Sequence, residues 1–377
     1  MRLDQSAQPA FARHETFHPR YGWMKKAYNG AAADPRVFTH EQATVRLGVG
    51  KNMVRAIRFW GLAARVLTHA PDPDRARLSL TVPSRIGATV FADDGWDPYC
   101  EDPATLWLLH WWLLAPKSLL PVWWVAIHDF SAVEFTEDRL EAFVADHISG
   151  IPGWEAPHPS SLQKDVSCLL RTYTAHGGPA RSGIDDWLDC PFRDLGLIRA
   201  VPGQARTYRF VIGAKPTLPP EVVAFAALDF LARTDAGSHT VTLSRLATEP
   251  GGPGRAFRLP ETHLADALDR TTGLGDLKLA TPAGIPQLSF EGDPAELATR
   301  ILYRYYSQRR KGLTSGHQVA GPDADAPAID QHTLDIAVER EPGQSAAAER
   351  EPILDDPPPH PRQSKPVGRA AKAGGRR

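Results

Sequence analysis

The sequence contains few cysteines and no long uninterrupted apolar run. Its three cysteines, at positions 100, 168 and 190 of 377 residues, have no close spacing, which argues against a disulfide framework and against a zinc ribbon. The longest apolar stretch, Leu106–Val125, is broken by His110, Lys117 and two prolines, so no membrane span is expected. The N-terminus lacks the apolar core of a secretory signal. We therefore expect a cytoplasmic protein with no membrane partner.

Three common nucleotide-binding and hydrolase motifs are also missing. The sequence has no phosphate-binding P-loop, no GxGxxG after a predicted strand and no GxSxG nucleophile motif. These absences disfavour nucleotide-driven motors and hydrolases with a serine triad.

Charge is balanced overall but unevenly distributed along the chain. The net charge is −1, and the hydrophobic content of 42% is enough for real cores. Between Asp34 and Val90, nine Lys and Arg face four Asp and Glu; between Phe91 and Gly150, eleven acids face only two bases. A basic segment followed by an acidic one is typical of a region that binds a polyanion next to a region with a different function. The alternative is a simple segregation of solvated faces.

A helix-turn-helix pattern lies in the basic region. A short helix near Thr39–Leu47, a glycine-containing turn and a helix over Lys51–Leu62 follow one another. Strands over Leu62–Leu67 and Arg77–Val82 would add a wing. The second helix of such a unit enters the major groove, although a winged helix can also serve protein contact. The residues expected to contact double-stranded DNA are Arg20, Lys25, Lys26, Arg46, Lys51, Asn52, Arg55, Arg58, Arg75 and Arg77.

The acidic segment that follows is the leading candidate for catalysis. Four carboxylates, at Asp93, Asp94, Asp97 and Glu101, precede a predicted helix. Mg²⁺ or Mn²⁺ requires such oxygen ligands in the hydrolysis of a phosphodiester, and Asp94 and Asp97 are the expected metal ligands. The alternative is structural, because Asp93-Asp94-Gly95 is also typical of a turn and Asp102-Pro103 of a helix start.

A second group of metal-ligating types lies near the N-terminus. His14, Glu15 and His18 fall within five residues, and imidazole and carboxylate suit divalent cations. Pro19 breaks any helix here, so spacing alone gives a weak prediction. The alternative is that this segment packs its aromatic side chains into the core.

The remaining pattern predicts a mainly α protein with small β-hairpins, an α+β fold. Winged helix-turn-helix units would be joined by a helical middle region. Predicted helices include Ala104–Leu114, Phe135–Ile148, Ser160–Tyr173 and Leu297–Arg309. The expected domains are a winged-helix DNA-binding domain (1–90), an acidic, Trp-rich helical region (91–183), a winged-helix-like C-terminal domain (184–312) and a disordered tail (313–377).

Four stretches resemble the family catalogued as domain of unknown function 4007. They are FARHETFHPRYGWMKKAY (Phe11–Tyr28), DPYCEDPATLWLLHWWLL (Asp97–Leu114), SLQKDVSCLLRTY (Ser161–Tyr173) and DCPFRDLGLI (Asp189–Ile198). The resemblance covers about Phe11 to Arg309 and carries no catalytic signature onto numbered positions. It implies DNA nicking before sulfur insertion in single-strand DNA phosphorothioation, a form of anti-phage defence. The implied partners are a cysteine desulfurase and ATP-dependent sulfur-transfer proteins.

Three functional hypotheses follow from the sequence. The first is a metal-dependent DNA-nicking endonuclease that works with sulfur-transfer partners. The second is a non-catalytic winged-helix DNA-binding subunit, and the third is a transcription regulator.

The composition of the tail generates a first prediction. The segment after about Gly312 is rich in Pro, Ala, Gly and charge and nearly free of aromatics, so it has little apolar surface to bury. Deleting Gly316–Arg377 should therefore leave the melting temperature of the protein nearly unchanged. A cooperative loss of stability in a thermal unfolding experiment would show that the tail docks onto the body.

Overall fold

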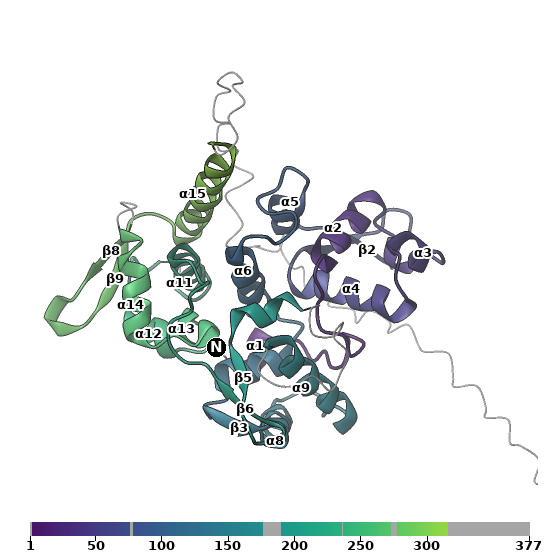
Figure 1. Cartoon of the computed structure of the whole chain (residues 1–377), viewed down its shortest axis with the longest axis horizontal. Helices are drawn as coiled ribbons and strands as arrows, with labels where there is room; N and C mark the ends of the chain where they lie inside the picture. The colour runs from purple at the N-terminus through teal and green to yellow at the C-terminus, as the bar shows by residue number, and fades with distance from the viewer. Residues whose placement is uncertain (1, 76–77, 176–189, 236, 273–276, 316–377) are drawn as a thin grey trace, which may run out of the picture. The chain divides into compact units, whose positions relative to one another are not determined.

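Helices form most of the part of the chain that the structure describes, and three small sheets lie among them (Figure 1). The computed structural model describes residues 2–75, 78–175, 190–235, 237–272 and 277–315. These residues belong to one unit, Met1–Glu339, and the tail beyond residue 315 lies outside them. No helix of the described ranges is long and apolar enough to cross a membrane.

The N-terminal part places a short helix, a glycine turn, a longer helix and a hairpin in succession. Helix α3 (Ala43–Leu47) ends at Gly48, whose φ of 63° is the left-handed conformation that glycine adopts without strain. Helix α4 (Lys51–Ala63) leads to the antiparallel pair β1 (Leu67–Pro71) and β2 (Ser79–Pro83). The other elements here are α1 (Leu3–Ser6), α2 (Trp23–Ala33), η1 (Val37–Thr39) and α5 (Arg85–Phe91).

The middle part is built around helix α6 (Pro103–Leu114), in which every residue after Pro103 is buried. Asp102 caps this helix by accepting a hydrogen bond from the Ala104 amide at 2.9 Å. The elements that follow are α7 (Pro121–Trp124), the π-helical turn η2 (Val125–Asp129), β3 (Glu134–Thr136), α8 (Glu137–Ser149), α9 (Pro159–Tyr173) and β4 (Thr174–Ala175).

The C-terminal part is organised by two long helices, α11 (Pro220–Thr234) and α15 (Pro294–Ser315), which pack against each other (Figure 1). Its other elements are η3 (Pro191–Leu195), β5 (Ile198–Ala200), β6 (Thr207–Phe210), β7 (Thr240–Thr242), α12 (Leu243–Thr248), α13 (Pro253–Phe257), α14 (Glu261–Asp269), β8 (Leu277–Ala280), η5 (Pro282–Gly284) and β9 (Gln287–Phe290).

The three sheets of the described residues are small. Strands β1 and β2 form the first, and the second has the order β3-β6-β5-β4, in which only β4 and β5 run parallel. The third has the order β7-β9-β8 and is antiparallel throughout. Because no sheet exceeds four strands, helix packing supplies most of the core.

Polar side chains of the buried helix α6 connect it to five residues elsewhere in the chain. Burial lowers the pKa of His110 to about 4, so this ring is neutral at pH 7 and satisfies both nitrogens inside the core. The contacts, at 2.6–3.2 Å, join Thr105 to Tyr306, Trp107 to Thr217, His110 to Tyr173 and to the Ala256 carbonyl, and Trp111 to Asp229.

The predicted α+β class with small hairpins is confirmed, and the helices expected at Ala104–Leu114 and Ser160–Tyr173 are present within a residue. The strand predicted over Leu62–Leu67 is wrong. Helix α4 continues through Ala63, and Arg65 then takes a φ of 60° that turns the chain before β1 begins at Leu67. Alanines 63 and 64 favour helix, which the apolar pattern alone did not reveal.

Candidate functional site

The exposed face at the start of α4 carries three of the residues predicted to bind DNA. Lys51, Asn52 and Arg55 are exposed, whereas Val54, Ile57 and Trp60 on the opposite face are buried. This is the amphipathic division that the spacing predicts. Arg55 lies 3.4 Å from Glu15, and both side chains remain accessible to solvent.

Three further basic residues predicted to bind DNA make hydrogen bonds within the protein. Lys25 is buried and donates to Asp93 and to the Phe91 carbonyl, each at 2.7 Å. Lys26 donates to the carbonyl of Leu47 at 2.7 Å, at the end of α3, where a cation meets the negative end of the helix. Arg58 is half-buried and donates to the Thr81 hydroxyl at 3.0 Å, which ties α4 to β2.

The other predicted DNA contacts are dispersed. Arg46 is exposed and paired with Asp34 at 2.5 Å. Arg75 is exposed in the turn between β1 and β2. Arg20 lies over the rings of Phe17 and Trp23, at 5.7 and 5.8 Å from their centroids. Arg77 lies outside the described residues.

In the loop that carries the predicted catalytic carboxylates, the central carboxylate, that of Asp97, has a structural role. Asp97 is only 7% exposed, and its two oxygens accept hydrogen bonds from the amides of Glu101 and Asp102 and from the hydroxyl of Thr105, at 2.6–3.0 Å. Asp93 is paired with Lys25, while Asp94 and Glu101 are exposed. We call the segment from Asp93 to Asp102 the acidic loop.

Helix α15 binds the acidic loop through its aromatic and basic residues. Asp102 accepts a hydrogen bond from the Tyr305 hydroxyl at 2.9 Å and is paired with Arg309 at 3.1 Å. Arg310 donates to the carbonyls of Asp94 and Gly95. The carboxylate of Asp102 and two backbone carbonyls of the loop therefore attach a helix that lies about 200 positions later in the sequence.

The predicted metal ligands do not form a metal site in this geometry. Both oxygens of Asp97 already accept hydrogen bonds from the protein, and Asp94 is exposed. Within the described ranges, no group of three or more His, Cys, Asp or Glu side chains is arranged to hold a metal ion. Mg²⁺ usually keeps several waters and is held by one or two carboxylates together with substrate phosphates, and of the two predicted ligands only Asp94 is exposed.

The residues of the second candidate metal site also make contacts within the protein. His14 is buried, and its Nε2 lies 2.6 Å from Asp165 on α9, while Glu15 pairs with Arg55. His18 is buried. Asp165 also accepts a hydrogen bond from the Ala12 amide at 3.0 Å, so the His14–Asp165 pair fixes the N-terminal segment onto α9. Sequence spacing could not reveal this partner 151 positions away.

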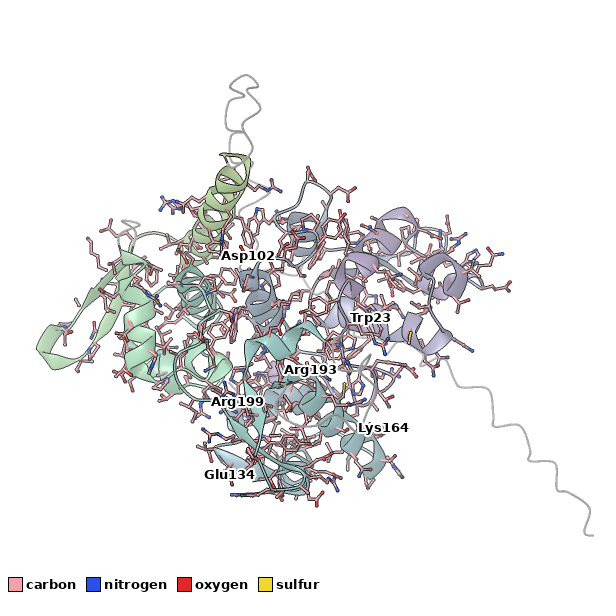
Figure 2. The ribbon with its side chains drawn as sticks, viewed as in Figure 1. Trp23, Asp102, Glu134, Lys164, Arg193 and Arg199 are labelled. Carbon is pink, nitrogen blue, oxygen red and sulfur yellow. The ribbon has the colours of Figure 1, made fainter. Side chains whose placement is uncertain are left out.

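A shallow hollow lies where three of the four stretches that carry the family resemblance meet. It is open to solvent and is lined mainly by apolar side chains. Its walls come from the segment Pro19–Lys25, from Pro98–Cys100 with one face of α6, and from Pro191 and Phe192. Trp23, Asp102 and Arg193, which lie in or beside these segments, are labelled in Figure 2.

Two tyrosines that the sequence did not single out as functional stand at this hollow. Tyr21 is 48% exposed and Tyr99 is 67% exposed, although both line it. Tyr21 donates to Asp194 at 2.8 Å, and burial together with Asp194 raises its pKa to about 12. The only available sequence signal was that both residues fall within stretches that resemble the family.

The backbone beside each tyrosine adopts a left-handed conformation. Gly22 has a φ of 74°, which glycine takes readily, and Cys100 has a φ of 56°, which is costly for a residue with a side chain. Cys100 follows Tyr99 in the acidic loop, so the bonds that Asp97 accepts from the next residues help to hold this conformation. Strained backbone of this kind is found more often at functional sites than elsewhere.

Comparisons with known proteins agree with the resemblance seen in the sequence. The model of the family described as "Protein of unknown function (DUF4007)" matches residues 11–306, so the expected family is confirmed. A solved structure described as SspB is 40% identical, with a TM-score of 0.76, and covers 82% of this chain and 91% of that protein. A second, described as magnesium ion-bound SspB, is 39% identical with the same TM-score and coverage. No curated protein matches the chain.

The two aspartates predicted to bind metal should differ sharply in their effect on stability. Asp97→Ala should lower the free energy of unfolding by about 2–4 kcal/mol, because it leaves two amides and a hydroxyl without their acceptor. Asp94→Ala, a matched change in the same loop, should alter it by less than about 0.5 kcal/mol. Urea unfolding measures both variants. Equal stability of the two would contradict the structural role of Asp97.

Proposed function

Because this chain belongs to the DUF4007 family, we propose that it is the DNA-nicking component of a single-strand DNA phosphorothioation system, the Ssp system. The observation that carries the proposal is the 40% identity to SspB over 82% of this chain, with a TM-score of 0.76. In this role the protein opens one strand of double-stranded DNA before sulfur insertion. Its partners are a cysteine desulfurase and ATP-dependent sulfur-transfer proteins, which act together in cytoplasmic anti-phage defence.

The DNA-binding part of the proposal rests on the N-terminal helices. The order of α3, a glycine turn, α4 and the β1–β2 hairpin supports the proposal of a winged helix-turn-helix unit. In such a unit the first turns of the second helix contact the major groove. Lys51, Asn52 and Arg55 occupy these turns and are exposed, so we assign duplex binding to them.

We assign no step of the nicking reaction to a metal ion. The magnesium ion in one of the similar structures supports Mg²⁺ or Mn²⁺ as the ion to test. Asp97 does not fit this ion, because both of its oxygens accept hydrogen bonds from protein donors, and the described residues gather no preformed group of three ligands. Asp94 and Glu101 remain the exposed carboxylates of the acidic loop, and they are the first to substitute once nicking is measured.

A second candidate function is favoured by the same geometry of the acidic loop. Since its carboxylates attach α6 and α15, the chain could serve as a non-catalytic subunit that binds DNA and positions partner enzymes. This subunit would bind DNA through α4 in the same way. The two functions differ only in whether the purified chain breaks a phosphodiester bond.

Nicking is tested on supercoiled plasmid. With Mg²⁺ or Mn²⁺ present, the purified protein should convert supercoiled plasmid to the open-circular form without linear product, and EDTA should abolish the conversion. Gel electrophoresis resolves the three forms. If plasmid is bound but stays supercoiled with either ion, the non-catalytic subunit is the correct function.

The basic face of α4 gives a separate prediction for affinity. The double substitution of Lys51→Ala with Arg55→Ala should weaken duplex binding and reduce the slope of log K against log salt by about 1.8, at about 0.9 for each phosphate that the protein no longer neutralises. Lys164→Ala, at an exposed lysine on α9 (Figure 2), is the matched control and should leave the slope unchanged. Fluorescence anisotropy over a salt series measures the slope of log K against log salt for each variant. An unaltered slope in the double variant would place the DNA elsewhere.

A further inference from the structure

Helix α4 carries positive charge and has no carboxylate of its own. Its sequence contains Lys51, Arg55 and Arg58 and no Asp or Glu. The carboxylate that pairs with Arg55 comes from a separate segment. Glu15, which lies 40 positions earlier in the chain, has its Oε1 3.4 Å from Nη1 of Arg55. An acidic side chain therefore lies on the face of α4 to which duplex binding is assigned.

The backbone that carries Glu15 is strained. Ala12, Glu15 and Thr16 have φ angles of 54°, 52° and 65°, in the left-handed region that costs free energy for residues other than glycine. Such conformations persist only where the surrounding structure determines them. With three of these residues in five positions, the place of Glu15 depends on contacts that the rest of the protein makes with this segment.

Side chains of α4 and α9 hold the segment on both sides of Glu15. The contacts join Asp165 to the Ala12 amide at 3.0 Å, Arg171 to the Thr16 carbonyl at 2.6 Å and Trp60 to the Phe17 carbonyl at 2.9 Å. Asp165 and Arg171 belong to α9, whereas Trp60 belongs to α4. The backbone on either side of Glu15 is therefore fixed, and its carboxylate is kept close to α4.

The pair of Glu15 and Arg55 contributes little to folding and bears directly on DNA binding. The two side chains are 29% and 48% exposed, and ion pairs this accessible to solvent add little to stability. A carboxylate accepts hydrogen bonds from a guanidinium group as a phosphate oxygen does. A DNA phosphate that reaches Arg55 must therefore displace Glu15 or approach against the repulsion of its charge.

We propose that Glu15 competes with the DNA backbone for Arg55 and thereby restrains the binding of duplex DNA. The inference rests on the proposed function, because it takes α4 as the duplex-binding helix. Phosphate contacts carry no sequence information. Weakening one of them lowers the affinity for every duplex, and discrimination between sites then depends more on base contacts such as those open to Asn52. Glu15 is in this sense a specificity-determining residue.

The test measures the binding of a fluorescein-labelled duplex of arbitrary sequence at physiological salt, by fluorescence anisotropy. Glu15→Gln keeps the size of the side chain and removes its charge, and it should tighten binding about three- to fivefold because the competing ion pair is lost. Glu41→Gln, at an exposed glutamate of the N-terminal part, is the matched control and should change the affinity by less than about 1.5-fold, since distant charges are screened. In an Arg55→Ala background, Glu15→Gln should gain no more than this control, because the competition acts through Arg55.

The outcomes separate this inference from the proposed function. If Glu15→Gln binds the duplex as the wild type does, or more weakly, or if its gain persists without Arg55, the proposed competition is wrong while DNA binding by the chain stands. If neither the wild type nor any variant binds a duplex, the proposed function and the inference fail together. Circular dichroism of each variant verifies folding.

Discussion

Complete burial of one helix is the constraint on which the rest of this structure depends. Helix α6 carries four leucines, three tryptophans and a histidine after its first turn, and none of them reaches solvent. A helix that is apolar on all sides must be surrounded by other elements. Here α9, α11, α13 and α15 each contribute a hydrogen-bonding partner to a polar group on α6. The helix thereby joins residues from the middle and C-terminal parts of the sequence in one core.

The start of α6 determines the form of the acidic loop. Asp102 accepts from the Ala104 amide, one of those that the start of a helix leaves without partners, and Asp97 accepts from the Glu101 and Asp102 amides just before the helix. The arginines and tyrosines of α15 then neutralise and bind the same loop. Because the loop is fixed at both ends, Tyr99 and the strained Cys100 are presented beside Tyr21. A cluster of carboxylates thus shapes a neighbouring surface, in addition to any chemistry of its own.

The sequence predicted elements better than it predicted sites. Apolar periodicity located α9 and the amphipathic division of α4, and the Asp102-Pro103 start signal located α6, because these depend on neighbours within one helix. The capping role of Asp102 was also readable, since its partner is two residues away. Asp97 and Lys25 were assigned to metal and DNA on residue type alone, yet their burial depends on the three-dimensional packing of α2, α5 and α6. Partners such as Tyr305 for Asp102 and Asp165 for His14 lie more than 150 positions apart. The hollow has walls from three separate segments, and no spacing rule joins them.

Hydrogen exchange of backbone amides, measured on the full chain with and without DNA, tests the central claim most directly. That claim is that DNA contacts the start of α4, while the acidic loop holds α6 and α15 together. The account predicts slower exchange on DNA binding at Lys51–Arg55, with no change in strands β7 to β9. Slower exchange confined to β7–β9 or to α8, with Lys51–Arg55 unchanged, would contradict it.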